Sequence, residues 1–139
     1  MAEQPTKVIH KIAAMVFKDD TFLMVKKHGK DIWTNLGGKP EGAETEQDAL
    51  VRETEEELDC DAKVIKKLGD FKNKAAFDDA IIHLSVYQVE LIGEPKISDP
   101  ELEEFAYIDK NYVEKGIKFP LSITEQIIPF CIKEGLLNW

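Results

Sequence analysis

Residues 38–60 of the 139-residue chain read GKPEGAETEQDALVRETEEELDC and combine a glycine-containing segment with a dense run of acids. Between residues 41 and 61 lie ten carboxylates and one base, Arg52, whereas the rest of the chain balances 17 acids with 17 bases. Like charges four residues apart on a helix repel by about 0.2–0.5 kcal/mol per pair. Such crowding works against folding unless something compensates for it, so the sequence predicts a binding site here.

Residues 45–58 contain neither Gly nor Pro and are rich in helix formers, which predicts a helix with Thr45 as its N-cap. At about 100° per residue, two stripes run along this helix, and Arg52 and Glu55 lie outside both. The acidic stripe holds Glu46, Glu53, Glu56 and Glu57. The apolar stripe beside it holds Leu50, Val51, Thr54 and Leu58. Burying the apolar stripe against a sheet would place the acidic stripe at the edge of a cleft.

A run of charges usually marks a solvated helix face, but such faces normally mix both signs. Three carboxylates at positions i, i+3 and i+4 can instead share one or two hard divalent cations. Magnesium fits because it takes oxygen ligands, keeps several waters and bridges to substrate phosphates. The residues just before the helix, Gly37, Gly38 and Lys39, offer close backbone approach and a point charge suited to phosphate. They form neither a P-loop nor a dinucleotide-binding motif.

Taken together, the glycine segment and the acidic helix resemble the Nudix box of the MutT-like hydrolases over the 23 residues from Gly38 to Cys60. The matching positions are Gly38, Glu44, Arg52, Glu53, Glu56, Glu57 and Cys60. Two positions depart from the family pattern: Asp59 stands where glycine is usual, and Thr54 where an aliphatic residue is usual. Neither departure removes an expected metal ligand, and Asp tolerates the left-handed conformation better than most residues.

The resemblance implies a metal-dependent hydrolase that cleaves a nucleoside triphosphate to nucleoside monophosphate and pyrophosphate. The implied cofactor is Mg²⁺, or Mn²⁺ in its place, and the implied ligands are Glu53, Glu56, Glu57 and the backbone carbonyl of Gly37 or Gly38. Glu53 or Glu56 would also orient or deprotonate water. Arg52 would hold the glutamates in place, Glu44 would support the loop, and Lys39 would grip the phosphate chain.

Other substrates stay open: a nucleotide sugar, ADP-ribose or a dinucleoside polyphosphate. The subclass signatures that contain proline are absent from residues 72–79, KNKAAFDD. A non-catalytic nucleotide sensor is a second alternative, disfavoured because every ligand glutamate is present. A diphosphate isomerase of the same fold would need a catalytic cysteine and metal-binding histidines, and neither Cys60 nor Cys131 is placed for that role.

Several residues are weaker candidates. The family often draws a further acid from a downstream loop, and the choice here stays open among Asp99, Glu101, Glu103 and Glu104. Trp33, Asn35 and Phe119 are candidates for contact with a base, although an aromatic in a strand is more often core. The scattered histidines, His10, His28 and His83, are expected to be structural or on the surface.

The flanking segments predict a mixed order of elements in one domain of residues 1–139. Residues 7–17 and 21–27 read as a hairpin, and residues 62–72, 80–91 and 104–108 as further strands. Residues 121–139 read as a closing helix, with Ser122 or Thr124 as cap and a kink or restart at Pro129. The predicted class is α/β (α+β), a Nudix-like α/β/α sandwich with a mixed central sheet.

Composition limits the partners. The formal net charge of −9 repels nucleic-acid backbones and anionic membranes, so we expect neither a nucleic acid polymer nor a membrane as partner. The partner that the family resemblance implies is a small-molecule nucleotide. Two distant cysteines and the lack of a charged-then-apolar leader suggest a reduced cytoplasmic protein. A homodimer is left open.

Overall fold

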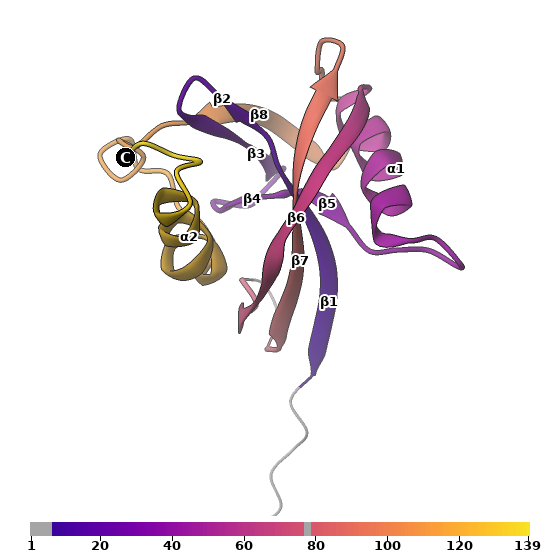
Figure 1. Cartoon of the computed structure of the whole chain (residues 1–139), viewed down its shortest axis with the longest axis horizontal. Coiled ribbons are helices and arrows are strands. Elements are labelled where there is room, and N and C mark those ends of the chain that lie inside the picture. Colours follow the sequence, from indigo (N-terminus) through magenta and orange to yellow (C-terminus); the bar gives the residue numbers. More distant parts are fainter. Residues whose placement is uncertain (1–6, 77–78) are drawn as a thin grey trace, which may run out of the picture.

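The structure is a computed structural model that describes residues 7–76 and 79–139, so part of the segment 72–79 lies outside the described residues. Figure 1 shows two helical regions on opposite sides of the strands. The elements in chain order are β1 (Val8–Met15), β2 (Phe17–Lys18), β3 (Thr21–Lys27), β4 (Trp33–Thr34), β5 (Leu36–Gly38), α1 (Glu46–Leu58), β6 (Asp61–Lys74), β7 (Ile81–Ile92), β8 (Leu102–Ile108), the π-helical segment η1 (Ser122–Ile127) and α2 (Ile128–Lys133).

The strands form one mixed sheet and one antiparallel sheet. The mixed sheet has the order β5-β1-β7-β6, in which β1 runs parallel to β7 and the other pairs are antiparallel. In the second sheet β3 pairs antiparallel with β2, β4 and β8. The mixed fold class is confirmed, although the strands are divided over two sheets where one was expected.

The predicted hairpin of residues 7–17 and 21–27 is correct only at its tip. Phe17–Lys18 pairs with β3 across a turn in which Asp19 and Asp20 have φ angles of 47° and 64°. Such positive angles suit a tight hairpin turn that follows the strand twist. Before the turn, β1 leaves β3 and pairs with β5 and β7, because a strand buried on both faces belongs in the middle of a sheet.

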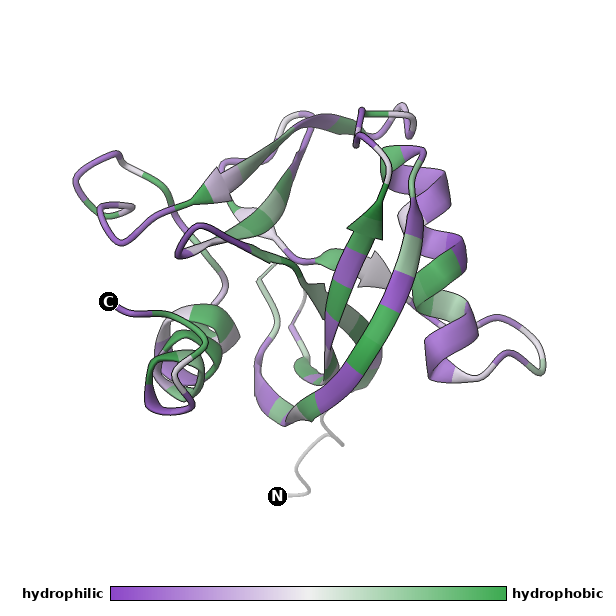
Figure 2. Cartoon of the chain, turned by 45° about the horizontal axis from the view of Figure 1, so that its top comes forward, coloured by the Kyte–Doolittle hydropathy of each residue, from purple (hydrophilic) through white to green (hydrophobic). Residues whose placement is uncertain are grey.

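Alternation along β1 divides the core into two clusters. Ile12 and Ala14 pack in the cluster that includes Leu50 of α1. Ala13 and Met15 pack in the cluster that includes Ile127 of η1. The alternating hydrophilic and hydrophobic bands along the long strands in Figure 2 reflect the same period of two. Each helical region therefore covers its own side of the strands.

Helix α1 begins and ends as its sequence predicts. The Thr45 side chain accepts a hydrogen bond from the Asp48 backbone N at 3.1 Å, which confirms the N-cap. Asp59 ends the helix in the left-handed conformation, with φ 52° and ψ 37°. Thr54 is fully buried, and its hydroxyl donates to the Leu50 carbonyl at 2.7 Å. Both departures from the family pattern are thus accommodated without an unsatisfied polar group.

The closing helix starts differently from the prediction. Leu121 occupies the N-cap position, and no side-chain hydrogen bond from the described residues caps it, so the capping roles given to Ser122 and Thr124 were wrong. Pro129 cannot donate a backbone hydrogen bond, and the chain widens into the π-helical η1 before α2 resumes at Ile128. The restart therefore lies one residue before Pro129. Within the described residues, no helix has the length and apolar character needed to cross a membrane.

Candidate functional site

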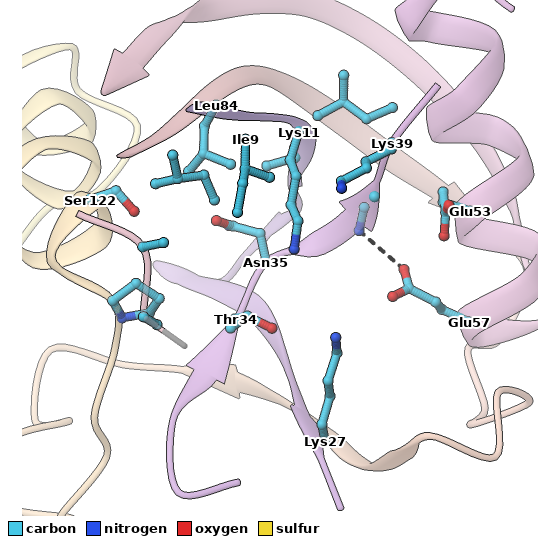
Figure 3. A pocket seen from close by; sticks show the side chains of 18 of the residues that line it. Ile9, Lys11, Lys27, Thr34, Asn35, Lys39, Glu53, Glu57, Leu84 and Ser122 are labelled. Atoms are coloured by element: carbon cyan, nitrogen blue, oxygen red, sulfur yellow. Dashed lines mark hydrogen bonds between the residues drawn. The ribbon is translucent and has the colours of Figure 1, made fainter. Parts of the chain in front are cut away.

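A cleft of about 580 Å³ opens between α1, the loop that follows β5, and the first half of β1 (Figure 3). Its charged and amide lining includes Lys11, Lys27, Asn35, Lys39, Glu53 and Glu57. Its apolar lining includes Ile9, Ile82, Leu84 and Pro120. The cleft thus joins a charged end, beside α1, to an apolar end, beside η1.

Two adjacent glycines let the loop lie against both β1 and α1. Gly37 has a φ of 142°, and a Cβ there would collide with the Ile12 carbonyl. A Cβ on Gly38 would lie 2.5 Å from Glu53 Oε1. A side chain at Gly37 would displace the loop from β1, and one at Gly38 would displace the Glu53 carboxylate.

Glu57 is a carboxylate buried at the wall of the cleft. Only 7% of the residue is exposed, and its Oε2 accepts a hydrogen bond from the Gly37 backbone N at 3.1 Å. Burial raises the pKa of Glu57 to about 8, the nearby carboxylates of Glu53 and Asp99 add to the rise, and the Gly37 hydrogen bond and Lys27 oppose it. The ionised form of Glu57 is therefore short of positive charge, which a bound cation would supply.

Arg52 connects the glutamates to the loop. Its guanidinium donates to both carboxylate oxygens of Glu44, at 2.8 and 3.0 Å, and to the Lys39 carbonyl at 3.0 Å. Its Nη1 donates to Glu53 at 3.1 Å and to Glu56 at 3.2 Å. The hydrogen bond from Arg52 lowers the pKa of Glu44. The hydrogen bonds to Glu44, Glu53 and Glu56 raise the pKa of Arg52. Charge-assisted bonds of this kind fix orientation as well as adding energy.

The three glutamates expected to bind metal are placed differently. Glu53 and Glu57 line the cleft, whereas Glu56 is 54% exposed on its side chain and faces Arg52. Burial raises the pKa of Glu53 although Arg52 opposes the shift. Over the described ranges, no three carboxylate, histidine or cysteine side chains converge into a ready-made metal site.

The donor set nevertheless fits Mg²⁺ or Mn²⁺. All the donors are hard oxygens on consecutive turns of one helix, facing a loop whose glycines leave room for the Glu53 carboxylate. The charge of Lys27 and the Gly37 hydrogen bond do not offset the burial of Glu57, so its pKa stays raised. An ion held by Glu53 and Glu56 would compete with the Arg52 guanidinium for their oxygens.

Two lysines in the cleft were not singled out from the sequence. In Figure 3 the ammonium ends of Lys11, Lys27 and Lys39 point toward the space beside Glu57. Lys11 shares the parity of Ala13 and Met15 along β1, so it is a charge on an inward-facing position. The alternation of side chains along β1 is the sequence signal that could have identified Lys11, because a charged side chain on an inward-facing position of a buried strand needs a polar site.

The downstream acids separate into two groups. Asp99 and Glu101 line the cleft. Glu103 and Glu104 instead approach Lys26, at 2.9 and 4.0 Å, outside the cleft. Ser98 ties this segment to the end of α1, since its backbone N donates to the Glu57 carbonyl at 3.0 Å and its hydroxyl to the Glu56 carbonyl at 2.7 Å.

Of the residues considered for contact with a base, Asn35 lines the cleft. Phe119 is buried in the core, with its ring centroid 5.8 Å from that of Phe22. Trp33 packs against the same core, and its backbone N donates to the Lys118 carbonyl at 2.9 Å. The two aromatic residues are therefore structural.

Glu46 does not join the acidic wall of the cleft, although it shares the helical phase of Glu53. It accepts a hydrogen bond from the Tyr87 hydroxyl at 2.7 Å and lies 3.2 Å from His10. The parallel register of β1 and β7 pairs His10 with His83, and their ring centroids are 4.8 Å apart. Two of the histidines that look scattered in the sequence are therefore neighbours, outside the cleft.

Comparison with known proteins gives matches over most of the chain. A family model described as the NUDIX domain matches residues 9–123. A CTP pyrophosphohydrolase from Escherichia coli (strain K12) is 31% identical over 87 residues, which cover 60% of this chain and 63% of that relative. The match thus spans less than two thirds of the relative's length.

Solved structures are similar over more of the chain. A MutT protein from Methanosarcina mazei Go1 has a TM-score of 0.75 at 15% identity, covering 95% of this chain and 99% of that one. The solution structure of the DNA mismatch repair protein MutT (family Nudix hydrolase) from methicillin-resistant Staphylococcus aureus 252 has a TM-score of 0.57 at 31% identity, covering 86% and 93%. At 15% identity, the similarity to the Methanosarcina mazei protein shows a shared fold alone.

Proposed function

This chain belongs to the NUDIX family, and from that premise we propose that it is a metal-dependent pyrophosphohydrolase. In this proposal it hydrolyses a nucleoside triphosphate to nucleoside monophosphate and pyrophosphate. The observation that carries the proposal is the meeting, in one cleft, of the carboxylates Glu53 and Glu57 with lysines from three separate segments. Carboxylates suit a divalent cation and ammonium groups suit phosphates.

The proposed roles follow from position. Glu53, Glu56, Glu57 and the carbonyl of Gly37 or Gly38 would hold Mg²⁺ or Mn²⁺. Such an ion neutralises charge on a diphosphate and makes a nearby water more acidic. Glu53 or Glu56 would orient that water and accept its proton, while Arg52 holds both carboxylates by hydrogen bonds.

Substrate binding would use the rest of the cleft. Lys39, with Lys11 and Lys27, would hold the phosphate chain, since all three ammonium groups point into the same space (Figure 3). The volume of about 580 Å³ suits a nucleotide-sized ligand. Asp99 and Glu101 are the downstream acids placed to assist, because they line the cleft.

A substrate panel tests the proposal. Nucleoside triphosphates, with CTP first because of the relative described as a CTP pyrophosphohydrolase, would be compared with a nucleotide sugar, ADP-ribose and a dinucleoside polyphosphate. Monophosphate, pyrophosphate and orthophosphate would be measured with Mg²⁺ and with excess chelator. We expect Mg²⁺-dependent monophosphate and pyrophosphate from triphosphates. Turnover confined to the linked nucleotides would transfer the assignment to them, and absence of all turnover would leave the sensor alternative.

The cytoplasmic location, the single domain and the homodimer stay predictions.

A further inference from the structure

We infer that Asn35 makes the cleft select nucleotides whose base carries an amino group at the position of cytosine N4 or adenine N6, over bases that carry a carbonyl at that position. This inference rests on the proposed function and names the substrate class for the same cleft. Its basis is the orientation of the Asn35 amide, which the buried core fixes from behind.

The amide nitrogen of Asn35 faces two thioethers. Its Nδ2 donates to the Met15 sulfur at 3.3 Å and to the Met24 sulfur at 3.6 Å. Thioether sulfur accepts hydrogen bonds and cannot donate them. Turning the amide over would therefore place its oxygen against the lone pairs of two sulfurs. Both methionines are fully buried, at 0% exposure, so the sulfurs stay where they are.

The other end of the amide is left for a ligand. With Nδ2 held by the core, Oδ1 points into the cleft, on the side where Ile9, Leu84 and Ser122 lie (Figure 3). Ile9 and Leu84 belong to the apolar wall, which suits the flat face of a base. The Ser122 hydroxyl can rotate to donate or accept, so it does not discriminate between bases. Asn35 presents an acceptor in a fixed position, and this acceptor can discriminate.

The chemistry of the bases gives the preference its direction. Cytosine N4 and adenine N6 are amino groups that donate, whereas uracil O4 and guanine O6 are carbonyls that accept. An amino group would complete a hydrogen bond with Asn35 Oδ1. A carbonyl at the same place would leave both oxygens buried without a donor. Sites built to pair with one polar group reject an analogue that lacks it, so we expect a preference of about tenfold or more in kcat/KM.

The test uses two substrate pairs, CTP against UTP and ATP against ITP, in which a carbonyl replaces the amino group and the neighbouring ring nitrogen gains a hydrogen. We expect the ratio of kcat/KM within each pair to favour the amino base by about tenfold or more. Replacing both sulfur acceptors, in Met15→Leu/Met24→Leu, frees the amide to rotate while conserving volume. This double variant should keep activity while its ratios fall toward one. Asn35→Leu should also lower the ratios, and Asn111→Leu, the same change on an exposed turn, should leave them unchanged.

Specific outcomes overturn the inference. Equal kcat/KM within each pair would overturn it while leaving the proposed function intact. If the folded double variant kept the full preference, the methionines would not be what orients the amide, and the inference would lose its basis. If the protein hydrolyses no nucleotide, calorimetric binding of CMP and UMP separates the two claims: selective binding of CMP supports the inference without the hydrolase, and equal or absent binding overturns it.

Discussion

Glu57, at the scale of a single residue, carries a carboxyl group whose burial disfavours its ionised form. Its carboxylate is buried with one backbone hydrogen bond, from Gly37, and near the carboxylates of Glu53 and Asp99. Glu55, two residues earlier on the same helix, is exposed. Two members of one acidic run therefore have different environments, and substitutions can distinguish their roles.

We predict that Glu57→Gln and Glu56→Gln each lower kcat by about 100-fold or more, because each removes a charge that positions the reacting groups. In the metal-free protein, stability should hold or rise for Glu57→Gln, since the variant no longer buries a carboxylate. Steady-state kinetics and urea unfolding measure the two effects. Glu55→Gln is the matched control, and a loss of similar size there would show that position along the helix does not determine the role.

Arg52 gives a second prediction at this scale. A lysine in its place keeps the charge but cannot pair with both oxygens of Glu44 while also reaching Glu53 and Glu56. We expect Arg52→Lys to weaken activity about 10- to 100-fold, in keeping with the loss of a residue that orients metal ligands. Kinetics over a range of Mg²⁺ concentrations would measure this, and wild-type kcat/KM at every concentration would contradict the assigned positioning role.

At the scale of elements, helix α1 is attached to the mixed sheet by a polar contact as well as by its apolar stripe. The Glu46 carboxylate meets Tyr87 on β7 and lies 3.9 Å from the Lys67 ammonium on β6. Burial favours protonation of Glu46, but hydrogen bonds from Tyr87 and Ser85 and the charge of Lys67 outweigh it and lower the pKa of Glu46 from its ordinary value of 4.5. Ionised Glu46 therefore stabilises the packing of α1 on the sheet.

The pH dependence follows from that direction. A carboxyl whose pKa is lower in the folded protein stabilises the fold above its unfolded pKa, and the contribution is lost as pH falls through the folded pKa. The window is thus below the ordinary value of 4.5. We predict that the free energy of unfolding falls less steeply on acidification in Glu46→Gln than in the wild type. Urea unfolding at a series of pH values measures this, with Glu55→Gln as control, and identical slopes for all three proteins would contradict it.

The bounds of α1 could be predicted from the sequence, whereas the pairing partners of β1 could not, and the two outcomes have different physical causes. The bounds of α1 depend on local signals, since Thr45 caps it and Asp59 ends it within a few residues of the helix itself. The partners of β1 depend on pairing with Ile81–Ile92, which lies far along the chain, and no local pattern specifies that choice. The place of His10 beside His83 was missed for the same reason.

At the scale of the whole molecule, the site is assembled from segments that the sequence keeps apart. The glycine loop and the glutamates of α1 could be predicted because they form one continuous motif. Lys11 could not be placed beside them without the register that brings β1 next to β5. Lys27 comes from β3, which lies in the other sheet. The acids at residues 99 and 101 line the cleft in a segment that Ser98 ties to the end of α1 and that the His28 backbone N contacts at the Glu101 carbonyl.

Charge at this scale predicts a response to metal. The net charge is −9, and the carboxyl groups of Glu53, Glu57 and Asp99 line the cleft. A cation that binds the folded state raises its stability, so we predict that millimolar Mg²⁺ or Mn²⁺ raises Tm by about 5 °C or more near saturation. Thermal scans measure the shift, with KCl at equal ionic strength as the control for simple screening. A shift no larger than that of KCl, or equal shifts for the wild type and Glu57→Gln, would contradict a specific metal site.

The central claim, hydrolysis of a triphosphate at an inner phosphorus, is tested most directly by the products formed in ¹⁸O-labelled water. The reaction would be run with Mg²⁺ and a triphosphate from the panel, and the label located by mass spectrometry at early times. We predict nucleoside monophosphate and pyrophosphate as the first products, with the label in one of them. Nucleoside diphosphate and labelled orthophosphate as the sole first products of every triphosphate would contradict the account and make the protein a phosphatase.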